Sequence, residues 1–79
     1  MEEVPHDYVP TYSQVTVLND ADMQTVKNLF DNAFKRGNHN VILSISKRLQ
    51  KVMEVETKQT ATNFVSTVLK DYSYYTQNL

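Results

Sequence analysis

The sequence contains no cysteine and no tryptophan, and Gly37 is the only glycine among its 79 residues. Without cysteine, no disulfide and no thiolate-bound zinc ion can stabilise a small core. Phosphate-binding loops and most small β-rich folds use several glycines for tight turns and positive φ angles. These absences favour an α-rich chain. With 41% hydrophobic and 22% charged residues, the composition is typical of a folded domain rather than a disordered segment.

Long apolar runs are also missing. The longest aliphatic stretch is residues 41–43, far short of the roughly 20 residues that a membrane-spanning helix needs. The N-terminal Met-Glu-Glu is acidic and lacks an apolar segment, so we expect no secretory signal and a cytoplasmic location. A composition rich in Asn, Thr, Gln and Tyr and poor in Gly, Ala and Pro is typical of AT-rich genomes, such as those of low-GC bacteria and their phages.

The formal net charge of -1 hides a separation of charge along the chain. Residues 1–34 carry six acidic side chains and one lysine, whereas residues 35–58 carry six basic side chains and two acidic ones. The sequence is therefore a charge dipole. This pattern favours either head-to-tail attraction between copies or binding of an anionic partner by the basic middle segment.

Residues 1–18 are predicted to form an extended N-terminal arm, followed by a helical domain over residues 19–79. Pro5 and Pro10 disfavour a helix in the arm, because each restricts its own φ angle and the conformation of the residue before it. After Pro10, β-branched and aromatic residues alternate in part. They predict a short strand or an extended segment that packs on a core.

The first helix is predicted over residues 19–36. Asn19 is a good N-cap, and Asp22 stands three residues later in the position of a capping box. Apolar residues then recur at helical spacing. Gly37 follows where a helix commonly ends on a residue in the left-handed conformation.

Neither glycine nor proline marks a boundary in the rest of the chain, so a single long helix is one interpretation. The apolar positions argue against it. Apolar residues at 42, 45, 49 and 52 predict further apolar residues at 56 and 59, but both positions are polar, and the apolar stripe resumes displaced by two residues. We therefore predict a second helix over residues 40–54 and a third over residues 57–76, with Thr57 as its N-cap. The expected fold is all-α, a small three-helix bundle preceded by the arm.

Enzymatic chemistry finds little support in the sequence. The two histidines, His6 and His39, have no companions at metal-ligand spacing. Glu54 and Glu56 are two residues apart and would point to different sides of a helix, which makes them a poor acid–base pair. We predict no catalytic residue, no metal site, no cofactor and no small-molecule substrate.

The spacing of residue types over residues 49–64 resembles that of a helix-turn-helix unit, in which a second helix enters the major groove of DNA. Two positions depart from that pattern: Gln50 stands where a small residue is usual, and Glu54 stands where glycine is usual. The acidic isoelectric point, about 6.0, also weighs against DNA binding. In this alternative, the nucleic-acid-binding residues would be Arg48, Thr57, Lys58, Gln59, Thr60 and Asn63.

Two groups of residues are candidates for contact with a partner. The basic residues of the second helix form either a solvated face or a docking site for an acidic surface, such as the arm of another copy. The tyrosines near the C-terminus either contact a partner or cover the open end of the bundle, with Tyr74 expected to be exposed. The predicted partner-binding residues are Lys47, Arg48, Lys51, Tyr72, Tyr74 and Tyr75.

The leading hypothesis from the sequence is a non-enzymatic intracellular interaction module. A chain this small gains only a few kcal/mol from one core, and without metal or disulfides it can gain stability by association. We therefore expect a homodimer that binds a protein partner, or itself, through the surfaces of its second and third helices, with no membrane contact. The alternative is a helix-turn-helix regulator that binds DNA.

Overall fold

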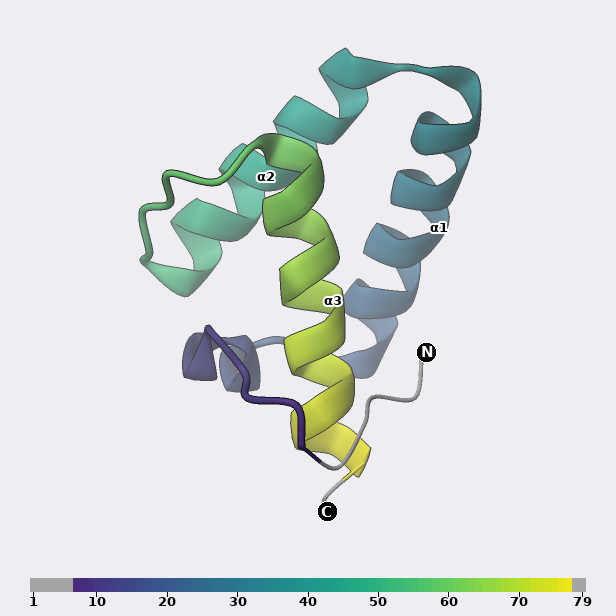
Figure 1. Ribbon diagram of the computed structural model, residues 1–79. Coiled ribbons are helices and arrows are strands. Elements are labelled where there is room, and N and C mark those ends of the chain that lie inside the picture. Colours follow the sequence, from purple (N-terminus) through teal and green to yellow (C-terminus); the bar gives the residue numbers. More distant parts are fainter. Residues whose placement is uncertain (1–6, 78–79) are drawn as a thin grey trace.

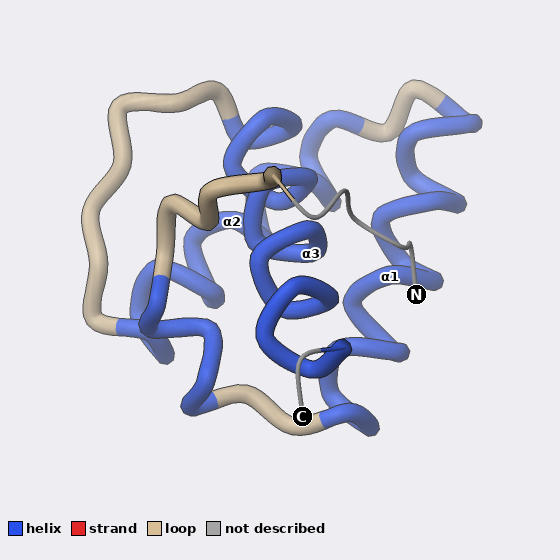
Figure 2. Tube along the Cα trace, turned by 60° about the horizontal axis from the view of Figure 1, so that its bottom comes forward, coloured by secondary structure: helices blue, strands red, loops and turns tan. Residues whose placement is uncertain are grey.

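A computed structural model describes residues 7–77 and contains three α-helices (Figure 1). Helix α1 spans Asp20–Arg36, α2 spans His39–Met53 and α3 spans Ala61–Gln77, and a short 3-10 helix, η1 (Ser13–Val17), precedes them. Residues 7–77 contain no strand (Figure 2). The prediction of an all-α, three-helix fold is confirmed.

Both ends of α1 follow from local chemistry, as predicted. The Asn19 side chain accepts a hydrogen bond from the backbone N–H of Asp22 at 2.8 Å, and its amide donates to the Asp22 carboxylate at 3.1 Å. At the other end Gly37 has a φ of 66°, and the N–H of Asn38 bonds to the carbonyl of Ala33 at 2.8 Å. This is the hydrogen-bond pattern of a Schellman motif.

Helix α2 ends in the same way, although no glycine is present. Glu54 has a φ of 56°, and it is the one residue other than glycine with a positive φ within residues 7–77. The N–H of Val55 bonds to the carbonyl of Gln50 at 3.0 Å, which repeats the pattern at the end of α1. The helix therefore ends close to the predicted place, and the interpretation of residues 41–76 as one long helix is excluded. The predicted end at residue 54 is one residue late.

The predicted start of α3 at Thr57 is wrong, because the helix begins at Ala61. The Thr60 hydroxyl accepts from the N–H of Asn63 at 3.2 Å and so takes the capping role. Thr57 lies in the connection between the helices, where its hydroxyl accepts from the N–H of Gln59 at 3.0 Å. Both threonines can cap a helix, and local sequence does not distinguish them.

The arm is also only partly as predicted. Residues 8–12 are not helical, but Ser13–Val17 forms η1 instead of a strand or extended segment. A lone strand would leave its backbone groups unpaired, whereas the 3-10 turn lets Leu18 N–H bond to the carbonyl of Val15 at 3.0 Å and buries Val15 completely. Residues 1–6 of the predicted arm lie outside the described residues.

Helix α3 is at the centre of the core. It packs against both α1 and α2, which form a hairpin joined at Gly37 and Asn38, and η1 packs against α3 and α2 (Figure 1). One side of the hairpin is thereby covered. The buried apolar residues are Val15, Met23, Phe30, Ala33, Ile42, Leu49, Met53, Phe64, Val65, Val68 and Tyr72.

Candidate functional site

The other side of the α1–α2 hairpin carries an apolar groove, which we call the open face. The groove encloses about 310 Å³ and is lined only by α1, α2 and Leu18, with no residue from α3. A second hollow of about 320 Å³ adjoins it and shares Leu29, Ile45 and Arg48. The groove residues are Leu18, Asp22, Met23, Thr25, Val26, Leu29, Ile45, Arg48, Leu49 and Val52.

Large apolar side chains on the open face remain in contact with solvent. Leu29 on α1 is 48% exposed and Val52 on α2 is 49% exposed, while Val26 and Ile45 are partly buried. Residues 26 and 29 share one face of α1, and residues 45 and 52 share one face of α2, because three- and seven-residue spacings return to nearly the same side of a helix. The two helices thus bring four apolar side chains to one surface.

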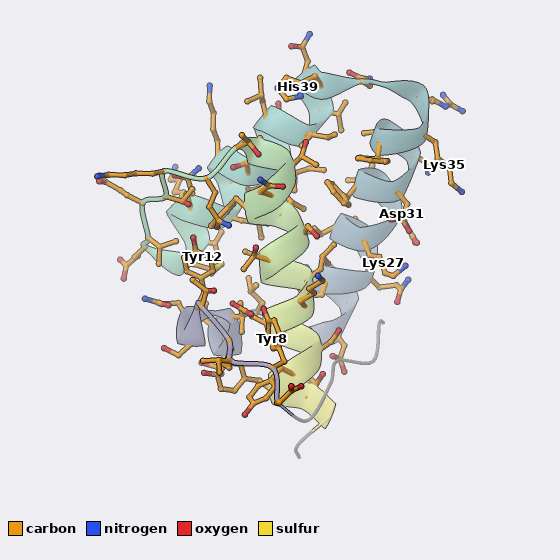
Figure 3. The ribbon with its side chains drawn as sticks, viewed as in Figure 1. Tyr8, Tyr12, Lys27, Asp31, Lys35 and His39 are labelled. Carbon is orange, nitrogen blue, oxygen red and sulfur yellow. The ribbon has the colours of Figure 1, made fainter. Side chains whose placement is uncertain are left out.

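Two opposite charges line this groove. Asp22 comes from the first turn of α1, and Arg48 comes from the middle of α2. They form no ion pair with each other: in residues 7–77 the one ion pair joins Lys27 and Asp31, at 3.1 Å (Figure 3). Arg48 makes no hydrogen bond to any residue in that part of the chain, so its guanidinium group is available to a partner.

The three basic residues predicted to contact a partner are all exposed on α2. Of these, only Arg48 lines the open face, whereas Lys47 and Lys51 lie outside both hollows. The sequence-based grouping therefore combines one groove residue with two residues of the neighbouring solvated surface.

Tyr72 is a core residue, which corrects the prediction that it contacts a partner. Its side chain is 5% exposed, and its hydroxyl donates a hydrogen bond to the Asp20 carboxylate. Burial first, and then the hydrogen bond and the charge of Asp20, raise the pKa of Tyr72 to about 12. The contact joins α3 to the first turn of α1.

The other two C-terminal tyrosines are half-buried. The rings of Tyr74 and Tyr75 meet nearly at right angles with their centroids 5.4 Å apart, and Tyr8 of the arm lies 6.0 Å from Tyr74. Tyr74 was expected to be exposed, but the arm covers part of it. This arrangement matches the alternative interpretation, in which the rings cover the open end of the bundle.

Asp71 holds the arm in place, and the sequence reasoning missed it. Its side chain is 0% exposed and accepts hydrogen bonds from the N–H groups of Thr11 at 2.9 Å and Tyr12 at 2.7 Å, and from the Tyr8 hydroxyl. Desolvation, followed by the hydrogen bond and the charge of Asp71, raises the pKa of Tyr8 above its ordinary value. Figure 3 shows Tyr8 beside the C-terminal half of α3. Asp71 stands three residues after Val68 on the apolar stripe, and that spacing was the available clue.

Most of the residues proposed to read DNA lie in the connection between α2 and α3. Thr57, Lys58, Gln59 and Thr60 precede α3, and only Asn63 lies in its first turn. The Tyr12 hydroxyl lies 3.0 Å from the Thr57 hydroxyl and donates to the side-chain carbonyl of Gln59 at 2.8 Å. The connection of residues 54–60 is also longer than the roughly three- to four-residue turn of a helix-turn-helix unit.

In the part of the chain that the structure describes, no three side chains of His, Cys, Asp or Glu are grouped so that they could hold a metal ion. His39 is exposed at the start of α2 (Figure 3). The Ser44 hydroxyl donates to the carbonyl of Asn40 at 3.1 Å, within its own helix.

A family model described as a domain of unknown function, DUF8484, matches residues 1–79. The chain belongs to this family. No curated protein and no solved structure matches the chain. None of the helices described for this DUF8484 member combines the length and the apolar character needed to span a bilayer.

Proposed function

We propose that this DUF8484 domain is a non-enzymatic, cytoplasmic interaction module that works as a homodimer, with the open face as the contact between copies. The sequence alone suggested the surfaces of α2 and α3. Burial of Tyr72 and coverage of α3 by the arm leave less surface there, so the proposed contact moves to α1 and α2.

The observation that carries the proposal is the continuous apolar groove with Leu29 and Val52 half-exposed beside it. Fully burying a Leu or Val side chain is worth about 1.5–3 kcal/mol, so two copies that cover both residues twice gain several kcal/mol before the costs of association. A specific interface needs about 800 Å² from each partner. That is roughly one seventh of the 5516 Å² accessible surface of this chain, an area that one face of a small bundle supplies.

Sedimentation equilibrium of the purified chain tests the proposal. The wild type should sediment as a dimer, and Leu29→Asp and Val52→Asp should each shift it toward the monomer, because a carboxylate would be desolvated in the interface. Val17→Asp is the matched control: Val17 is 64% exposed on η1 but lines neither hollow of the open face. A wild type that stays monomeric at high micromolar concentration, at both low and physiological salt, would contradict the proposal.

The helix-turn-helix alternative is not favoured by the geometry, since four of its six proposed DNA-contacting residues lie in the connection and the Tyr12 hydroxyl contacts two of these four. It retains a clear test. A DNA-binding regulator would retard duplex DNA at low salt, and the effect would weaken when Lys58 or Arg48 is neutralised. The homodimer proposal predicts no such retardation.

A further inference from the structure

The two walls of the open face carry opposite charges. The α1 wall contributes Asp22 and no base to the groove, whereas the α2 wall contributes Arg48 and no acid to the groove and to the adjoining hollow. The Asp22 carboxylate accepts a hydrogen bond from the neutral Asn19 side-chain amide at 3.1 Å. Each wall therefore presents a charge that has no opposite charge bound to it within residues 7–77.

This distribution discriminates between two ways of placing a second copy on the same face. A two-fold axis parallel to the hairpin sets α1 of each copy over α2 of the other, so that each Asp22 meets the partner's Arg48. A two-fold axis across the hairpin sets α1 over α1 and α2 over α2, so that like charges approach each other. In an isologous contact every pair of residues occurs twice, which doubles the difference in electrostatic energy between the two arrangements.

We propose that Asp22 and Arg48 set the register of the homodimer, with each Asp22 paired to the Arg48 of the second copy about a two-fold axis parallel to α1 and α2. This inference rests on the proposed homodimer. The apolar side chains of the face supply most of the affinity, and the two charge pairs select this arrangement over the crossed one.

Complementary charge reversal tests this arrangement. Asp22→Arg alone and Arg48→Asp alone each convert two attractive pairs into two repulsive ones, and should weaken self-association about tenfold or more. An equimolar mixture of the two variants restores both attractive pairs in a heterodimer. The double variant D22R/R48D restores both pairs in a homodimer. Dissociation constants come from sedimentation equilibrium at low salt, with circular dichroism to establish that each variant is folded.

Two control substitutions separate a local effect from a change in net charge. Gln24→Arg lies on α1 and Lys51→Glu on α2, and both residues are exposed and outside the groove. Their dimers should match the wild type within about twofold. Salt provides a second measure, because added salt should weaken a dimer held in this register and strengthen one in which like charges meet.

The outcomes distinguish the register from the dimer itself. Loss of self-association in each single variant, with recovery in the mixture and in the double variant, supports the register. Wild-type affinity in both single variants, or a dimer strengthened by salt, overturns the register and leaves the homodimer standing. A monomeric wild type overturns both proposals.

Discussion

At the scale of single residues, Asp71 joins the arm to α3. It is a fully buried carboxylate whose oxygens receive two backbone N–H groups and one phenol from residues about 60 positions earlier in the chain. Hydrogen bonds to a charged acceptor are stronger than neutral ones, and buried donors left without an acceptor are costly. This one side chain therefore accepts three hydrogen bonds that tie the arm to α3.

Asp71→Asn should lower the free energy of unfolding by about 2 kcal/mol, because the amide group places N–H donors where donors already point. Chemical denaturation measures the change, and hydrogen exchange should show faster exchange at Thr11 and Tyr12. Tyr8→Phe is the milder comparison, since it removes one donor and leaves the two backbone bonds intact. Unchanged exchange at both amides in Asp71→Asn would contradict this role.

The contact between Tyr72 and Asp20 makes stability depend on pH in the alkaline range. The pKa of Tyr72 is about 12 in the folded chain, against 10.0 for an ordinary tyrosine, so the folded state holds the proton more tightly than the unfolded state. The stabilisation that protonated Tyr72 contributes to the folded state is fully present below about pH 10 and is lost as the pH rises through the pKa of Tyr72 in the folded chain.

The wild type should accordingly lose stability between about pH 10 and pH 12, and Tyr72→Phe should lose less over the same interval. Denaturation at a series of alkaline pH values measures this difference. Near-ultraviolet absorbance should also show tyrosines that ionise later than the exposed ones. A Tyr72→Phe variant with the same alkaline loss as the wild type would show that Tyr72 is not responsible.

At the scale of helices and turns, local chemistry accounts for what could be predicted. Asn19 and Gly37 mark the ends of α1 because their roles depend only on neighbours within a few residues. The start of α3 could not be predicted in this way, because Thr57 and Thr60 are both suitable caps. In the folded chain the Thr57 hydroxyl lies in a tertiary contact with Tyr12, 45 residues away, and Thr60 caps the helix.

Helices α1 and α2 both end at a residue in the left-handed conformation, Gly37 and Glu54, and substitutions at these two positions should change stability in opposite directions. Glu54→Gly should raise the free energy of unfolding by about 1 kcal/mol, because glycine adopts a positive φ without the cost that a side chain brings. Gly37→Ala should lower it by a similar amount. An added Cβ at Gly37 meets no atom within 4 Å, so the cost comes from the backbone conformation alone. Thermal or chemical unfolding of both variants measures these changes in the free energy of unfolding. A loss of stability in Glu54→Gly would contradict this explanation.

At the scale of the whole molecule, the candidate site could be predicted only in part. The exposed basic residues of α2 follow from helical periodicity, and Arg48 is among them. Its position opposite Asp22 does not, because it depends on how α1 and α2 pair in space. The contacts of the tyrosines could not be predicted for the same reason: Asp20, which accepts from Tyr72, and the arm, which covers part of Tyr74, are both distant in sequence.

The central claim is that the open face joins two copies of this DUF8484 domain, and an isotope-filtered nuclear Overhauser experiment on a mixture of labelled and unlabelled chains tests it most directly. We predict intermolecular contacts between methyl groups of the two helices, from Val26 and Leu29 of one copy to Ile45 and Val52 of the other. Intermolecular contacts confined to Val17 or to the rings of Tyr74 and Tyr75, or none at all at high micromolar concentration, would contradict the claim.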